Sequence, residues 1–201
     1  TPEKIAPFKS ADVVAIVDRG KGAVNLKDEL SGKSDRLLKL ARATKDVKGL
    51  SLVSLTTDNY GLIRRSIAVF EKGRIIAIAD GVRYDEGGFS PSVGYKTVTV
   101  CGVKIGLAVG RDVIDRDALN CFSLCDVDVI IDLSADFYYF SVETLDAAVS
   151  YIGGWTVVCS GAFGCVAYSR GKKIIASIEK EILFDVSTDR SYREYVVKRR
   201  I

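Results

Sequence analysis

Three runs of apolar, largely β-branched residues constrain the fold of this chain most. They lie at Ala11–Asp18, Lys104–Val109 and Asp128–Leu133. A strand with one face in water alternates polar and apolar residues, whereas a strand buried on both faces is a nearly continuous apolar run. The sequence therefore predicts a β-sheet in which both faces are covered by other parts of the protein.

Amphipathic helices and hairpins account for much of the remaining chain. One helix is predicted from Ser34, as its N-cap, to Lys48, and Gly49 ends it. Its apolar face comprises Leu37, Leu40, Ala41 and Thr44. Further helices are predicted at Arg116–Cys125 and Ser141–Ile152, and strands at Leu50–Thr56, Arg65–Glu71, Arg74–Ala79, Lys96–Val100, Trp155–Ser160, Cys165–Ser169 and Lys173–Ile178. Strands that alternate with helices and hairpins predict an α/β fold with a mixed sheet covered by helices.

Composition narrows the class of protein. A chain of 201 residues, 48% hydrophobic and 27% charged, fits a single globular domain over residues 1–201. The net charge is +3 and no block of Lys or Arg occurs, so we expect no nucleic-acid partner. No apolar run approaches the ~20 residues that cross a bilayer, and Thr1 does not begin a signal peptide. We therefore expect no membrane partner and a cytoplasmic location.

The cysteines support a reducing compartment. They are odd in number and lie mostly in apolar patterns, which favours free, buried thiols over a disulfide framework. The five are Cys101, Cys121, Cys125, Cys159 and Cys165. Because the chain has no His, Cys121 and Cys125 would form only part of a zinc site. We expect no metal and no cofactor.

A glycine-containing elbow follows one of the buried strands. The segment from Cys101 to Asp112 reads C-G-V-K-I-G-L-A-V-G-R-D, with Gly110 after the apolar run. Other motifs occur in a fixed order around it. They are Asp58-Asn59-Tyr60-Gly61, the turn Gly73-Arg74-Ile75-Ile76, Glu86 with Phe89-Ser90-Pro91, and the strand Asp128 to Ala135. This ordered set resembles the nitrilase, or carbon–nitrogen hydrolase, superfamily over nearly the whole chain.

The resemblance implies a nitrilase-type α-β-β-α sandwich of mixed β-sheets covered by helices. Only Pro2 to Ser10 precede the first strand, where the family usually has a strand and a full helix, so we expect an N-terminally shortened version. Family members bury outer helices against a second subunit, which implies a homodimer or higher oligomer. The apolar residues of the Ser141–Ile152 helix are a candidate contact, with packing on the protein's own sheet as the alternative. They are Val142, Leu145, Val149 and Ile152.

The family's three catalytic positions are substituted. The family uses a Glu base, a Lys that stabilises the oxyanion, and a Cys nucleophile. In this chain Asp18 stands at the Glu position, Gly81 at the Lys position and Gly110 at the Cys position. A glycine can neither attack a nitrile or amide nor donate from a side chain. The resemblance therefore implies a scaffold that has lost the hydrolase reaction.

The substituted pocket could still hold a ligand. Arg83, two residues after Gly81, is expected on the same strand face, and Arg111 follows Gly110 directly. With Asp112 and Glu86 nearby, they are the candidate binding residues for a small carboxylate or amide. The alternative is that Arg111 pairs with Asp18 or Asp112 and fills the old cavity.

Three functions remain open at this point. The leading hypothesis is a non-catalytic binding or oligomeric interaction protein. The second is an amide hydrolase with a relocated nucleophile such as Cys159, which ends a strand beside Ser160-Gly161. The third is a purely structural homo-oligomer.

Overall fold

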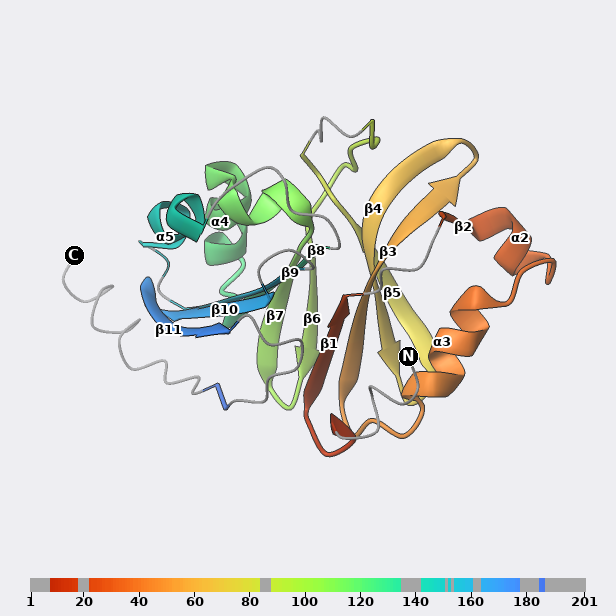
Figure 1. Cartoon of the computed structure of the whole chain (residues 1–201), viewed down its shortest axis with the longest axis horizontal. Coiled ribbons are helices and arrows are strands. Elements are labelled where there is room, and N and C mark those ends of the chain that lie inside the picture. Colours follow the sequence, from red (N-terminus) through yellow and green to blue (C-terminus); the bar gives the residue numbers. More distant parts are fainter. Residues whose placement is uncertain are drawn as a thin grey trace.

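The computed structural model describes residues 8–17, 22–83, 88–134, 142–150, 152, 154–160, 164–177 and 185–186. Two β-sheets pack face to face in the middle of the molecule, and helices cover the outer face of each (Figure 1). The predicted helix, sheet, sheet, helix layering is confirmed. Among the described residues, no helix is both long and apolar enough to cross a membrane.

The first sheet combines two parallel pairs with two antiparallel hairpins. Its order is β1-β3-β4-β5, and β2 pairs with β3. The tight turn between β4 and β5 is confirmed, because Lys72 and Gly73 both have positive φ, as a two-residue turn of this kind requires. Helices α2 and α3 lie on the outer face of this sheet (Figure 1). The elements are β1 Val13–Val17, β2 Val24–Asn25, α2 Leu26–Leu30, α3 Arg36–Thr44, β3 Leu50–Asn59, β4 Leu62–Glu71 and β5 Arg74–Asp80.

The second sheet has the order β11-β10-β9-β8-β7-β6. β7, β8 and β9 are parallel, while the strands at both ends pair in antiparallel fashion. A short 3-10 helix, η2, follows β7, and α4 and α5 cover the outer face (Figure 1). The elements are β6 Lys96–Val100, β7 Val103–Ala108, η2 Gly110–Ile114, α4 Arg116–Leu124, β8 Val129–Ser134, α5 Val142–Val149, β9 Trp155–Ser160, β10 Gly164–Ser169 and β11 Lys172–Ser177.

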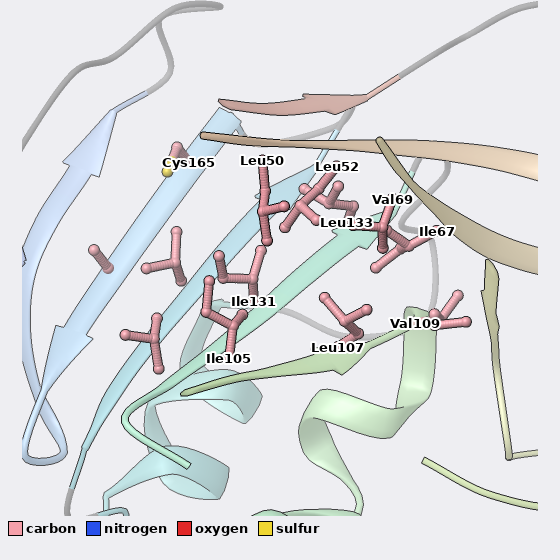
Figure 2. Packing of buried hydrophobic residues seen from close by; sticks show 14 residues of the cluster. Leu50, Leu52, Ile67, Val69, Ile105, Leu107, Val109, Ile131, Leu133 and Cys165 are labelled. Carbon is pink, nitrogen blue, oxygen red and sulfur yellow. The ribbon is translucent and has the colours of Figure 1, made fainter. Parts of the chain in front are cut away.

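The largest hydrophobic cluster lies between the two sheets. Side chains from β3 and β4 meet side chains from β7, β8 and β10 across this layer, as Figure 2 shows for Leu50, Val69, Leu107, Ile131 and Cys165. Separate clusters lie under the helices on each outer face. The continuous apolar runs in the sequence therefore mark strands that are covered on both faces.

The predicted N-cap of the first long helix is wrong. The helix α3 begins after Asp35, whose side chain forms no cap bond. Its first amides instead donate to the Glu29 carboxylate, Arg36 N at 2.8 Å and Leu37 N at 3.1 Å, and the Ser34 hydroxyl also donates to Glu29. A carboxylate from the preceding turn replaces a local cap. The predicted apolar face is confirmed, since all four of its residues are buried.

Part of the candidate subunit contact on α5 packs within the chain. Leu145 and Val149 are completely buried in the cluster that α5 forms with the second sheet, beside Val158 and Val166. Ile152 packs against the same cluster. At Leu145 and Val149 the alternative prediction, packing on the protein's own sheet, therefore holds.

Candidate functional site

The elbow after β7 places Gly110 at the end of the inter-sheet layer. Val109 is extended and 4% exposed, and Gly110 begins η2 with φ of +65°. This is the left-handed region, which costs other L residues roughly 1–2 kcal/mol. The turn thus favours a glycine at the position where the nitrilase motif has its cysteine.

Asp112 joins the elbow to the loop that follows β5. Its carboxylate accepts hydrogen bonds from Val82 N at 3.2 Å, Arg83 N at 3.0 Å and Val109 N at 3.3 Å. Burial raises the pKa of Asp112 to about 6, although the three amides act in the opposite direction. Because Asp112 is only 1% exposed and accepts from main-chain amides that follow β5 and β7, one strand from each sheet, its carboxylate is a structural clamp.

Gly81 lies directly against the elbow. Its N–H donates to Arg65 O at 2.9 Å and its carbonyl accepts from Ser92 N at 2.8 Å. A Cβ added at Gly81 would lie 3.4 Å from Val109 O and 3.6 Å from Val109 Cβ. The structure therefore places Gly81 against the elbow that precedes Gly110; the sequence resemblance assigns these two glycines to the Lys and Cys positions of the family.

Arg83 follows a different course from the one predicted. β5 ends at Asp80, so Gly81 to Arg83 form a loop, and the same-face argument for a strand does not apply. The guanidinium pairs with Asp115, through Nε at 2.7 Å, and with Asp117, through Nη2 at 2.7 Å. These partners raise the pKa of Arg83. Its side chain is bound to the start of α4.

Three further candidates are placed as follows. Arg111 is half-buried in η2, next to Gly110. Asp18 and Glu86 lie outside the described residues. The proposed roles of these three residues stay predictions.

The two carboxylates that pair with Arg83 were not predicted from the sequence, although the sequence shows that they begin a helix. Asp115 stands just before the helical pattern of α4, and its side chain accepts from Ala118 N at 3.0 Å as a helix N-cap. Asp117 is in the first turn of the same helix. An acidic helix start is a favourable site for an arginine, but nothing in the sequence indicates which arginine reaches it.

The cysteines only partly match their prediction. All five are free, but Cys101, Cys121 and Cys125 are exposed rather than buried. Cys101 lies at the opposite end of β7 from the elbow, with its Sγ 3.9 Å from Asp12, as expected from the strand length. Cys159 and Cys165 face each other with their Sγ atoms 3.6 Å apart. This pair was missed, although the spacing of six residues across a hairpin could have suggested it.

The cysteine pair affects its own ionisation. Hydrogen bonding with Cys165 and burial raise the pKa of the Cys159 thiol, and the charge of Asp132 adds to this effect. The same contact lowers the pKa of Cys165, because the Cys159 S–H donates to its sulfur. The Cys159 thiol is therefore less acidic than an ordinary cysteine thiol.

These features define a class of fold. Two facing mixed sheets, helices on both outer faces, and a turn that follows a buried parallel strand together give the α/β sandwich of the nitrilase superfamily. The sequence matches no protein-family profile and no curated protein.

Several solved structures share this fold at low sequence identity. A variant of the amidase from Nesterenkonia sp. AN1 aligns with a TM-score of 0.71 and 14% identity, over 100% of this chain and 88% of the amidase. A carbon–nitrogen hydrolase from Helicobacter pylori G27 aligns with a TM-score of 0.66 and 16% identity, over 87% of this chain and 76% of the hydrolase. A glutamine-dependent NAD+ synthetase from Acinetobacter baumannii aligns at 0.65 and 15% identity, over 86% of this chain but 38% of the synthetase.

Proposed function

We propose that this chain is a nitrilase-fold protein that does not hydrolyse carbon–nitrogen bonds and acts by binding, either as a homo-oligomeric interaction protein or as a receptor for a small carboxylate or amide. The observation that carries this proposal is the contact between Gly81 and the Val109-Gly110 elbow. Gly81 and Gly110, which the sequence resemblance assigns to the Lys and Cys positions, lie on the two sides of this contact, and neither has a side chain.

The chemistry of amide hydrolysis explains why this contact matters. Covalent hydrolysis needs a nucleophile within reach of a base and a donor aimed at the developing oxyanion. Gly110 supplies no nucleophile and Gly81 supplies no ammonium group. The buried carboxylate beside them, Asp112, already accepts from three main-chain amides. A loss of the nucleophile together with its electrostatic partner removes the reaction pathway.

The relocated nucleophile receives less support. A cysteine nucleophile acts as its thiolate and is normally activated by a lowered pKa or an adjacent base. The pKa of Cys159 is raised, and its thiol hydrogen-bonds to Cys165 rather than to a base. An amidase based on Cys159 would have to overcome both effects.

Of the two kinds of binding, the small-ligand role loses one of its candidate residues. Arg83 was a principal candidate for a carboxylate ligand, but its guanidinium is held by Asp115 and Asp117. Arg111 remains the candidate guanidinium for a small ligand. The three exposed free thiols fit a reducing compartment, which supports a cytoplasmic location.

Amide turnover tests this proposal. The Nesterenkonia amidase has been crystallised with butyramide, so we would measure ammonia release from acetamide and butyramide by the wild-type chain. We expect no release above that of a Cys159→Ser variant. Turnover that is abolished by Cys159→Ser would overturn the proposal in favour of an amidase. Light scattering of the same sample, with a dimeric or larger mass expected, separates the interaction role from a monomeric binding protein.

A further inference from the structure

Two cysteines lie at directly opposed positions of neighbouring strands. β9 and β10 are antiparallel, and their register pairs Cys159 with Cys165. Both residues pack with the cluster between the sheets, where Figure 2 shows Cys165 near Leu50. The Sγ atoms are 3.6 Å apart. The pairing of the strands, rather than a chance contact of mobile side chains, keeps the two thiols adjacent.

This arrangement allows a disulfide without movement of the strands. Opposed residues of antiparallel strands have Cα atoms roughly 4.5–5.5 Å apart. Disulfides join Cα atoms roughly 4.4–6.8 Å apart with a bond of about 2.05 Å. The sulfurs therefore approach by side-chain rotation from 3.6 Å, while the ladder between β9 and β10 stays in register.

The two thiols differ in their access to solvent. Cys165 is 5% exposed, whereas Cys159 is partly exposed. The lowered pKa of Cys165 and the raised pKa of Cys159 have the same origin, a thiol that donates to its neighbour. Two thiols in contact, one of them partly exposed, allow a sulfenic acid formed on one sulfur to condense with the other thiol.

We infer that Cys159 and Cys165 form a redox-active dithiol that a hydroperoxide converts reversibly to an intramolecular disulfide. The thiolate of one of the two cysteines attacks one peroxide oxygen, the O–O bond breaks, and the departing oxygen takes up a proton to leave as an alcohol or water. The sulfur of the other cysteine, 3.6 Å away, attacks the resulting sulfenic acid. The S–O bond then breaks, and its oxygen leaves as water with the proton of the second thiol. Two thiols are oxidised and one peroxide is reduced.

The experiment uses a Cys101→Ser, Cys121→Ser, Cys125→Ser variant, in which only the paired cysteines remain. The protein is treated with hydrogen peroxide, denatured with N-ethylmaleimide, and weighed by mass spectrometry. We expect the oxidised protein to lose the mass of two hydrogens and to bind no maleimide, and dithiothreitol to restore two additions. Chymotryptic cleavage at Phe163 should leave the two cysteine peptides linked until they are reduced.

A matched control adds Cys159→Ser to the same variant. This protein should keep a maleimide-reactive Cys165 or gain oxygen there, and it should form no linked peptides. Two full maleimide additions after peroxide, or separate oxygen additions on both cysteines of the parent variant, would overturn the inference. The readout is chemical and does not depend on hydrolase activity or on the proposed function.

Discussion

The Asp112 clamp can be tested by Asp112→Ala. The substitution removes the acceptor of Val82 N, Arg83 N and Val109 N, which join the loop after β5 to the elbow. A hydrogen bond to a charged group contributes about 1.5–3 kcal/mol, and a buried donor left without an acceptor costs about 1–3 kcal/mol. Val109 is buried, whereas the loop amides can regain water. The substitution also removes a buried negative charge, which is favourable and offsets part of the loss. We therefore expect Asp112→Ala to lower the free energy of unfolding by about 2–5 kcal/mol at neutral pH.

The pH dependence of this loss has a definite sign. Burial raises the pKa of Asp112 to about 6 from an ordinary 3.8. The folded state therefore holds the Asp112 proton more tightly than the unfolded state does. Protonated Asp112 contributes its whole stabilisation below the unfolded pKa of 3.8, and this contribution is lost as pH rises through about 6. The alanine variant lacks this contribution. The difference in unfolding free energy between wild type and Asp112→Ala should therefore be about 1 kcal/mol larger at about pH 5 than at about pH 7.5.

Urea unfolding followed by tryptophan fluorescence at both pH values measures the two effects. The matched control is Asp117→Ala, an exposed partner of Arg83 whose loss should cost under about 1 kcal/mol at either pH. An Asp112→Ala protein as stable as this control would refute the clamp. A deficit that grows with pH would refute the burial argument for its pKa.

Three further substitutions test separate contacts by the same unfolding assay. Gly110→Ala should lower the unfolding free energy by about 1–2 kcal/mol, because φ at Gly110 is +65°. The control Gly94→Ala, whose added Cβ has no atom near it, should be nearly neutral, and equal costs for the two variants would contradict the elbow geometry. Tyr168→Phe should lose about 1–3 kcal/mol by removing a buried hydroxyl that donates to Asp146, and an unchanged midpoint would reject that bond. Glu29→Gln should lose about 1 kcal/mol by weakening the carboxylate cap of α3, and a neutral effect would show that the cap contributes nothing.

The strands and long helices were predictable because their burial is encoded locally. The apolar run Asp128–Leu133 is covered on both faces and forms β8, and the apolar spacing in α3 predicted its buried face. The helix α2 was missed because it buries no residue and therefore has no apolar period. The spacing of apolar residues predicts which side chains are buried, but it does not predict a short helix whose first turn is capped by Asn25.

Contacts between distant segments were less predictable. The sequence placed Asp112 and Arg83 near one another, and the structure brings them together through the Arg83 main chain rather than its side chain. The guanidinium reaches Asp115 and Asp117, which come from another element and follow Arg83 by more than thirty residues. The strand periodicity used for Arg83 failed because β5 ends before it. Which donors meet which acceptors depends on how the two sheets pack, and no local pattern contains that information.

Covalent trapping tests the absence of a catalytic nucleophile most directly. A variant of the Nesterenkonia amidase shows covalent addition of the acetamide moiety of fluoroacetamide at its active site cysteine. We would treat the Cys101→Ser, Cys121→Ser, Cys125→Ser variant, kept reduced, with fluoroacetamide and map any adduct by mass spectrometry. The account predicts no adduct on Cys159 or Cys165 beyond that of the denatured protein. Rapid, stoichiometric modification of Cys159 in the folded protein would contradict it and identify a working nucleophile.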